Sequence, residues 1–99
     1  MDCALNDNLI HSIQAIGEKY AINRIVVFGS RARGDHKPTS DIDLAVYPLQ
    51  EFMSRGYFCS DIDDLATLFK IDVVFINDHT DKKLLGNIEK EGVVIYERL

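Results

Sequence analysis

Four short runs rich in β-branched and aromatic residues constrain the fold more than any other feature of this sequence. Runs of this kind are typical of buried β-strands, which are commonly about five residues long. The four runs are residues 24–28 (RIVVF), 41–47 (DIDLAVY), 70–76 (KIDVVFI) and 93–96 (VVIY). Polar residues or apolar residues at helical spacing separate the runs, so the sequence predicts strands that alternate with helices.

The segment ahead of the first run predicts a helix. Leu9, Ile13 and Ile16 recur at helical spacing. Asn6 or Asp7 precedes them, and either side chain can cap the start of a helix. The apolar residues would form the stripe that packs on the sheet.

Two later segments also predict helices. Residues 49–69 are expected to form one long helix, which Gly56 can interrupt. Its apolar stripe would comprise Phe58, Ile62, Leu65 and Phe69. The segment Asp81–Glu91 predicts a shorter helix closed by Gly92. Residues 31–40 are polar and predict a loop with at most one helical turn. We therefore expect an α/β fold with a mixed sheet of about four strands and flanking helices.

Composition limits the size and the partners of the protein. The 99 residues, 46% of them hydrophobic, predict one domain over residues 1–99 with one core. Lys and Arg number 11 against 16 Asp and Glu, a formal charge of −5, which argues against a long nucleic acid as partner. Cys3 and Cys59 form no C-x-x-C motif, and no stretch reaches the roughly 20 apolar residues of a membrane span. These features predict a soluble cytoplasmic protein.

Asp41 and Asp43 are the first candidates for chemistry. Residues i and i+2 of a strand point to the same face, so the two carboxylates would lie side by side. Like charges this close repel each other unless a cation lies between them, and carboxylate oxygens suit Mg²⁺ or Mn²⁺. The alternative is a pair of hydrated acids on an exposed strand edge.

Asp72 is the one charged residue inside the run IDVVFI. If Ile71, Val73 and Phe75 face the core, Asp72 lies on the opposite face of its strand. Should that strand lie beside residues 41–47, three carboxylates would converge and could hold two divalent ions about 3.5–4 Å apart. The alternative is an ordinary exposed acid.

A Gly-Ser turn follows the first strand and precedes two arginines. Gly29 allows a phosphate to approach the backbone, and Ser30 can donate to phosphate oxygens. Arg31 and Arg33 can neutralise phosphate charge, and Gly34 permits a further turn. The Walker A spacing is absent. The alternative is a strand-ending turn followed by a solvated basic loop.

Taken together, the chain reads Gly-Ser, ten residues, Asp-x-Asp, then a lone Asp on a later strand. This pattern resembles the minimal nucleotidyltransferases (MNT) of the DNA polymerase β-like superfamily. The likeness is strongest to the prokaryotic MNT proteins, which are commonly antitoxins paired with a HEPN-domain toxin. The segments GSRARG and SDIDLAV fit the family pattern without departure, and the likeness covers essentially the whole chain.

The resemblance implies a role for each site residue. Gly29 and Ser30 would hold the β- and γ-phosphates of ATP, with help from Arg33. Asp41 and Asp43 would bind two Mg²⁺ ions, although Mn²⁺ stays possible.

Asp72 would complete the second metal site and lie where the acceptor hydroxyl loses its proton. The implied reaction is transfer of AMP to a hydroxyl of the partner HEPN toxin, a tyrosine in family members tested as antitoxins. Two alternatives stay open: an antitoxin that neutralises its partner by contact alone, and a small-molecule adenylyltransferase. A chain of 99 residues leaves little mass to hold a separate acceptor, which favours a partner protein.

A second Asp-Ile-Asp, in the segment SDIDD at residues 60–64, is not expected to bind metal. In a helix, Asp61 and Asp63 would point about 200° apart. Ser60 with Asp63 resembles a helix cap and predicts a structural role. The three histidines lack metal-ligand spacing and are expected to be exposed.

Overall fold

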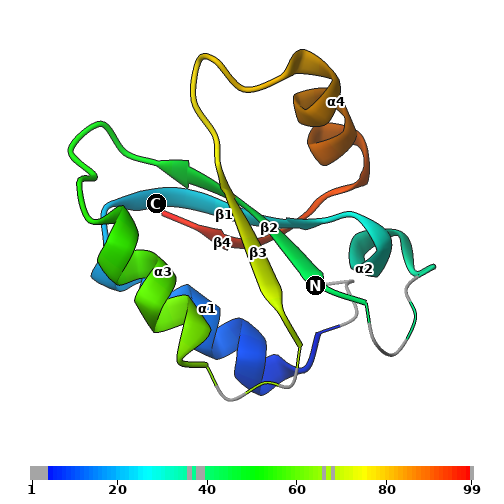
Figure 1. Ribbon diagram of the computed structural model, residues 1–99, viewed down its shortest axis with the longest axis horizontal. Coiled ribbons are helices and arrows are strands. Elements are labelled where there is room, and N and C mark those ends of the chain that lie inside the picture. The colour runs from blue at the N-terminus through cyan, green and yellow to red at the C-terminus, as the bar shows by residue number, and fades with distance from the viewer. Residues whose placement is uncertain (1–4, 36, 38–39, 66, 68, 99) are drawn as a thin grey trace.

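The computed structural model describes residues 5–35, 37, 40–65, 67 and 69–98 (Figure 1). Within these residues the elements alternate between helix and strand, as expected. In chain order they are α1 (Asp7–Lys19), β1 (Ile22–Phe28), α2 (Ser30–Arg33), β2 (Ile42–Pro48), α3 (Arg55–Asp63), β3 (Ile71–Phe75), α4 (Lys82–Glu91) and β4 (Val93–Glu97). Each strand begins and ends within two residues of its predicted bounds.

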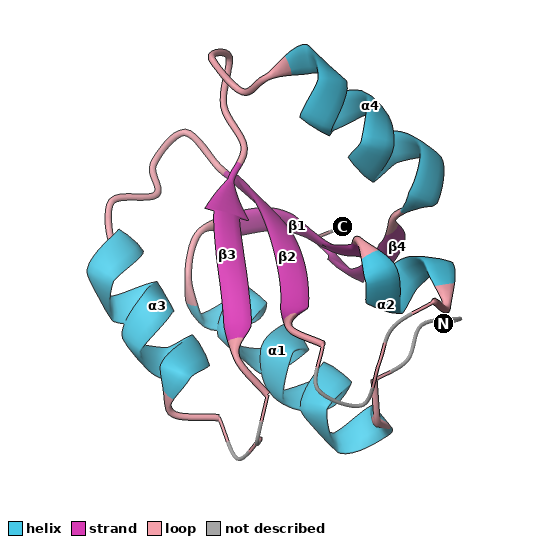
Figure 2. Cartoon of the chain, turned by 45° about the vertical axis from the view of Figure 1, so that its right-hand side comes forward, coloured by secondary structure: helices cyan, strands magenta, loops and turns pink. Residues whose placement is uncertain are grey.

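The four strands form one mixed sheet in the order β3-β2-β1-β4. β1 pairs antiparallel with both β2 and β4, whereas β2 and β3 run parallel. Parallel neighbours need a crossover connection, and α3 provides it between β2 and β3. Figure 2 shows β2 and β3 side by side, pointing the same way. The expected mixed α/β fold is confirmed.

α1 and α3 cover one face of the sheet and enclose the main core. The α1 stripe is as predicted, with Leu9, Ile13 and Ile16 buried. Asn6 caps this helix, because its Oδ1 accepts a hydrogen bond of 2.8 Å from the Leu9 amide. The ring of Phe58, on α3, is fully buried in this core.

α4 covers part of the opposite face. Its Ile88 packs with Val26 of β1 and Ala45 of β2 in a separate buried cluster. Alternate strand residues face opposite sides, so Asp43, two residues before Ala45, lies on the face that carries α4. The helix α4 and the Asp43 carboxylate therefore lie on the same face of the sheet.

The predicted helix over residues 49–69 is wrong in extent, because among the described residues of this range only Arg55–Asp63 is helical. Phe52 leaves the helical pattern to pack on Phe75, with ring centroids 5.7 Å apart, so residues 49–54 stay irregular. Gly56 lies in the first turn of α3 and does not interrupt it.

The predicted cap at Ser60 and Asp63 is also wrong. Both residues lie inside α3, whose N-cap is Ser54, and the Ser54 side chain makes no capping hydrogen bond. Within the described residues, no helix combines the length and apolar character that a membrane span requires.

Candidate active site

Asp43 and Asp72 lie opposite each other on neighbouring strands. Asp43 is near the start of β2 and Asp72 near the start of β3, and the two are register partners in the parallel pair. Neighbouring strands lie about 4.8 Å apart, so both carboxyl groups emerge from the same face within reach of one ion. Asp41 is exposed and directly precedes β2. The prediction that these strands are neighbours is confirmed.

The electrostatics of Asp43 show that the three acids share one neighbourhood. Burial raises the pKa of Asp43, and the negative charges of Asp72 and Asp41 raise it further. The charge of Arg33 acts in the opposite direction. Each neighbouring carboxylate therefore makes it harder to ionise Asp43, the condition under which a cation would be attracted.

A complete set of metal ligands is not formed in the described part of the chain. No cluster of three or more His, Cys, Asp or Glu side chains there is arranged to enclose an ion. Asp72 Oδ1 lies 3.3 Å from Lys70 Nζ, an ion pair between two exposed side chains. The donor chemistry nevertheless fits a hard divalent cation, because the two register partners offer only carboxylate oxygens.

Gly29 has no side chain and so leaves room for the carboxylate of Asp43. Its backbone has φ of 77°, a conformation that L side chains rarely adopt. A Cβ at this position would lie 2.6 Å from Oδ2 of Asp43, so the carboxylate rests directly on the glycine. Ser30 follows and begins α2. The Gly-Ser turn thus lies against Asp43.

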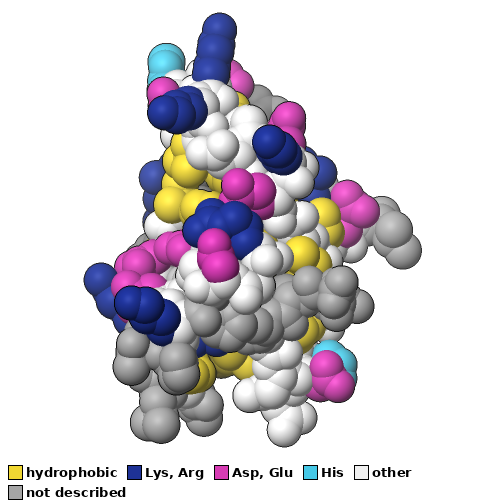
Figure 3. Space-filling view, turned by 90° about the vertical axis from the view of Figure 1, so that its right-hand side faces the viewer, with side chains coloured by type: hydrophobic (Ala, Val, Ile, Leu, Met, Phe, Trp, Pro, Cys, Tyr) yellow, Lys and Arg dark blue, Asp and Glu magenta, His cyan; other side chains and the backbone are white. Residues whose placement is uncertain are grey.

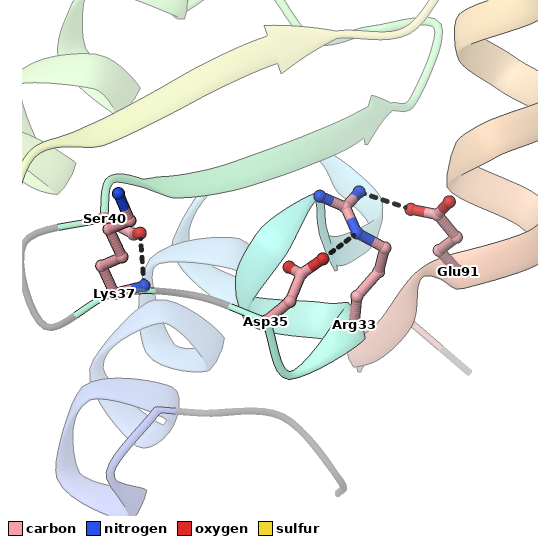
Figure 4. A network of polar contacts seen from close by, with 5 residues as sticks. All are labelled: Arg33, Asp35, Lys37, Ser40 and Glu91. Atoms are coloured by element: carbon pink, nitrogen blue, oxygen red, sulfur yellow. Dashed lines mark hydrogen bonds and ion pairs between the residues drawn. The ribbon is translucent and has the colours of Figure 1, made fainter.

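Arg33 lies beside the site but is shared by two acids (Figure 4). Its Nε contacts Asp35 at 3.1 Å and its Nη1 contacts Glu91, in the last turn of α4, at 2.9 Å. Figure 4 shows the other terminal nitrogen turned toward β2. The Glu91 contact was not foreseen from sequence, since 58 residues separate the two and no local motif links them.

The face that α2 and α4 share carries both signs of charge. In Figure 3, acidic and basic side chains of the described residues are intermixed over this face. An intermixed surface gives little of the continuous positive field that a phosphate backbone requires.

A comparison of sequences decides the family. Residues 11–99 match the family described as Polymerase beta, Nucleotidyltransferase. The chain belongs to this family. Among curated proteins, none matches the chain significantly.

Solved structures share the fold of this nucleotidyltransferase domain. A toxin–antitoxin structure solved with AMP-PNP matches with a TM-score of 0.66 at 22% identity, over 95% of this chain and 75% of that one. A mutant of the toxin–antitoxin MntA-HpeT matches with a TM-score of 0.66 at 20% identity and the same coverage. A candidate nucleotidyltransferase from Sulfolobus solfataricus matches with a TM-score of 0.54 at 24% identity, over 92% of this chain and 82% of that one. At these identities the likeness concerns the fold.

Arg31 of this nucleotidyltransferase is buried. The sequence left open that Arg31, like Arg33, could neutralise phosphate charge or lie in a solvated loop, but only 5% of its surface is exposed. Its Nε and Nη2 donate to the carbonyl oxygen of Ser40 at 3.2 and 2.9 Å. The physical reason is the tight turn of α2, which directs one arginine to the solvent and the other into the protein.

The second Asp-Ile-Asp segment has a structural role, but through a contact of Asp61 rather than through the predicted cap at Ser60 and Asp63. Asp61 Oδ2 accepts hydrogen bonds from Lys19 Nζ at 2.9 Å and from the Tyr20 hydroxyl at 2.8 Å. His11 and His79 are exposed, as expected, and His36 lies outside the described residues.

Proposed function

We propose that this nucleotidyltransferase transfers AMP from ATP to a hydroxyl group of a partner protein, a tyrosine of a HEPN-domain toxin, and thereby acts as an antitoxin. Membership of the Polymerase beta nucleotidyltransferase family supports the reaction class. The likeness to toxin–antitoxin structures, one of them solved with AMP-PNP, supports the partner and the nucleotide.

One observation carries the proposal. Asp43 and Asp72 are register partners, and the Gly29-Ser30 turn lies against Asp43. A phosphate-binding turn and two carboxylates on one sheet face are the parts that metal-assisted phosphoryl chemistry needs. Fixed positions matter here because catalysis of this kind depends on orientation and charge stabilisation.

The residues divide between the nucleotide and the cations. Gly29 and Ser30 hold the β- and γ-phosphates, and Arg33 contributes a positive charge. Asp41, Asp43 and Asp72 hold two Mg²⁺ ions, for which Mn²⁺ can substitute. When bound, these ions would offset the triphosphate charge and polarise the α-phosphate.

The reaction is a displacement at the α-phosphorus of ATP. The acceptor hydroxyl oxygen forms a bond to that phosphorus, the bond to the α–β bridging oxygen breaks, and pyrophosphate leaves. Asp72 takes the hydroxyl proton as general base. Lys70, 3.3 Å from the Asp72 carboxylate, then lies beside the acid that has accepted the proton.

A labelling experiment tests this function. The protein is incubated with Mg²⁺, α-³²P-labelled ATP and the protein product of its neighbouring gene, and the Asp43→Asn variant is the control. We expect the partner to be labelled by the native protein and not by the Asp43→Asn variant. Tight binding without label would instead establish an antitoxin that acts by contact, and label on small molecules only would establish a small-molecule adenylyltransferase.

A further inference from the structure

Arg31 connects the two segments that lead into the carboxylate-bearing strands. Its guanidinium donates two hydrogen bonds to the carbonyl of Ser40, the residue directly before Asp41. The same group stacks on Phe69, two residues before β3, with 4.2 Å from Cζ to the ring centroid. From these contacts we infer that Arg31 is a positioning residue, which fixes the entrances of β2 and β3 and so sets the separation of the metal-binding carboxylates.

A backbone hydrogen bond also joins the segments that lead into β2 and β3. The Ile42 amide donates to the Lys70 carbonyl at 2.9 Å, which joins the residue after Asp41 to the residue after Phe69. Arg31 joins the residue before Asp41 to Phe69 itself. Two links on either side of Asp41 thus hold the strand entrances, and movement of one entrance is passed to the other.

Only an arginine can make both contacts at once. The guanidinium is planar, so it donates hydrogen bonds in its plane while its face stacks on an aromatic ring. A lysine carries a compact charge on a flexible stem and would keep at most one of the two contacts. Substitution of Arg31 by Lys therefore keeps the charge and loses the geometry.

Burial separates this role from phosphate binding. Arg31 has 5% of its surface exposed, whereas the side chain of Arg33 is 44% exposed and lies at the rim. A guanidinium that is buried and turned toward a backbone carbonyl is poorly placed to meet an incoming triphosphate. The two arginines of one short helix therefore divide the work: Arg33 faces the nucleotide and Arg31 supports the carboxylates.

The molecule supplies a matched control. The Arg24 guanidinium lies over the Tyr47 ring with 4.3 Å from Cζ to the ring centroid, nearly the same distance, at the other end of β1 and β2. Arg24→Lys and Tyr47→Leu therefore remove a comparable stacking contact away from the carboxylates. The corresponding test variants are Arg31→Lys and Phe69→Leu.

Because this inference rests on the proposed function, the test measures metal binding apart from activity. Mn²⁺ is titrated into each protein, and free Mn²⁺ is followed by electron paramagnetic resonance. Melting curves establish that each variant is folded at the titration temperature. Residues that orient metal ligands indirectly are typically worth 10- to 100-fold in metal affinity, so we expect about 10-fold weaker Mn²⁺ binding in Arg31→Lys and in Phe69→Leu. The two control variants should bind Mn²⁺ as the native protein does.

The possible outcomes are distinct. Native affinity in Arg31→Lys and Phe69→Leu, or equal losses in the control pair, would overturn the positioning role while leaving the proposed function intact. If Arg31→Lys does not fold, Phe69→Leu decides, since that side chain is partly exposed and its removal is tolerable. No Mn²⁺ binding by the native protein would overturn the proposed metal site, and the positioning role with it.

Discussion

The sequence Ser-Asp-Ile-Asp occurs twice in this protein, at residues 40–43 and 60–63, with opposite results. The first copy leads into β2 and places Asp43 on the sheet face that α4 partly covers. The second lies in α3, where Asp61 is held by a lysine and a tyrosine. The same four residues thus form a candidate catalytic site in one place and a structural contact in the other.

One aspartate of each copy has a shifted pKa, and the two shifts have opposite signs. They are Asp43, the last residue of the first copy, and Asp61, the second residue of the other copy. Burial and neighbouring acids raise the pKa of Asp43. Hydrogen bonds from Lys19 and Tyr20 lower the pKa of Asp61. The local sequence therefore supplies the carboxylates, while the elements packed around them decide whether burial and like charges disfavour the ionised form or hydrogen bonds stabilise it.

The largest expected contrast lies in catalysis. Asp43→Asn keeps the shape of the side chain but removes a proposed metal ligand, so the proposed AMP transfer should fall by more than about 100-fold, the upper range found for indirect partners of metal ligands. Asp63→Asn, at the same position of the second copy, should transfer AMP at the native rate. Rates of labelled AMP transfer measure both. A native rate in Asp43→Asn would mean that the metals lie on other residues.

The second largest effect concerns Gly29, which lies against Asp43 of the first copy. Gly29→Ala should destabilise the fold by about 1–3 kcal/mol, because φ of 77° with ψ of −154° is strained for alanine. It should also reduce AMP transfer, since the new Cβ would displace the Asp43 carboxylate. Gly56→Ala in α3 is the control, because a Cβ there meets no described atom within 4 Å and alanine favours helix. Urea unfolding that ranks Gly29→Ala above Gly56→Ala in stability would refute this account.

The basic partners of the two copies should also differ in function. Arg33→Ala should weaken Mg²⁺-ATP binding by about 10-fold, close to the 1.5 kcal/mol lower limit for a hydrogen bond to a charged group. Its melting midpoint should hardly change, since its ion pairs are exposed. Lys19→Ala should bind the nucleotide as the native protein does. Calorimetric titration compares them, and equal affinities in all three proteins would remove Arg33 from the site.

The smallest effects concern stability against pH. A raised pKa means that folding penalises ionised Asp43, so its contribution is lost as pH rises from the ordinary aspartate value of about 3.9 through the raised pKa. Asp43→Asn should therefore be at least as stable as the native protein at neutral pH. For Asp61 the stabilisation is present above that ordinary value and is lost as pH falls through the lowered pKa.

Asp61→Asn should therefore be less stable than the native protein at neutral pH and lose this deficit in acid. Thermal unfolding between pH 3 and 7 of both variants gives the comparison. A decrease in stability at neutral pH for Asp43→Asn would show that its carboxylate is satisfied in the same way as that of Asp61.

Sequence reasoning succeeded where one periodicity dominates. The two-residue repeat of a strand places Asp43 opposite to Ile42 and Leu44, and both apolar residues are buried. It failed where packing between distant segments decides. Nothing local distinguishes Arg31 from Arg33, because Phe69 and Glu91, which hold them apart, come from other parts of the chain. The prediction of one helix over residues 49–69 was wrong in extent for the same reason, because Phe52 packs on Phe75 of a distant strand.

The position of β3 at the sheet edge has a consequence for how this site responds to heat. Among the described residues, β3 pairs with β2 alone, so a single ladder of backbone hydrogen bonds joins it to the rest of the sheet. Edge strands can open locally at a lower free energy than the whole domain, because few buried contacts are broken. Opening of β3 would separate Asp72 from Asp43 while α1, β1 and β2 stay folded. We therefore expect backbone amides of β3 to exchange with deuterium faster than those of β1, and AMP transfer to fail on heating before the core melts.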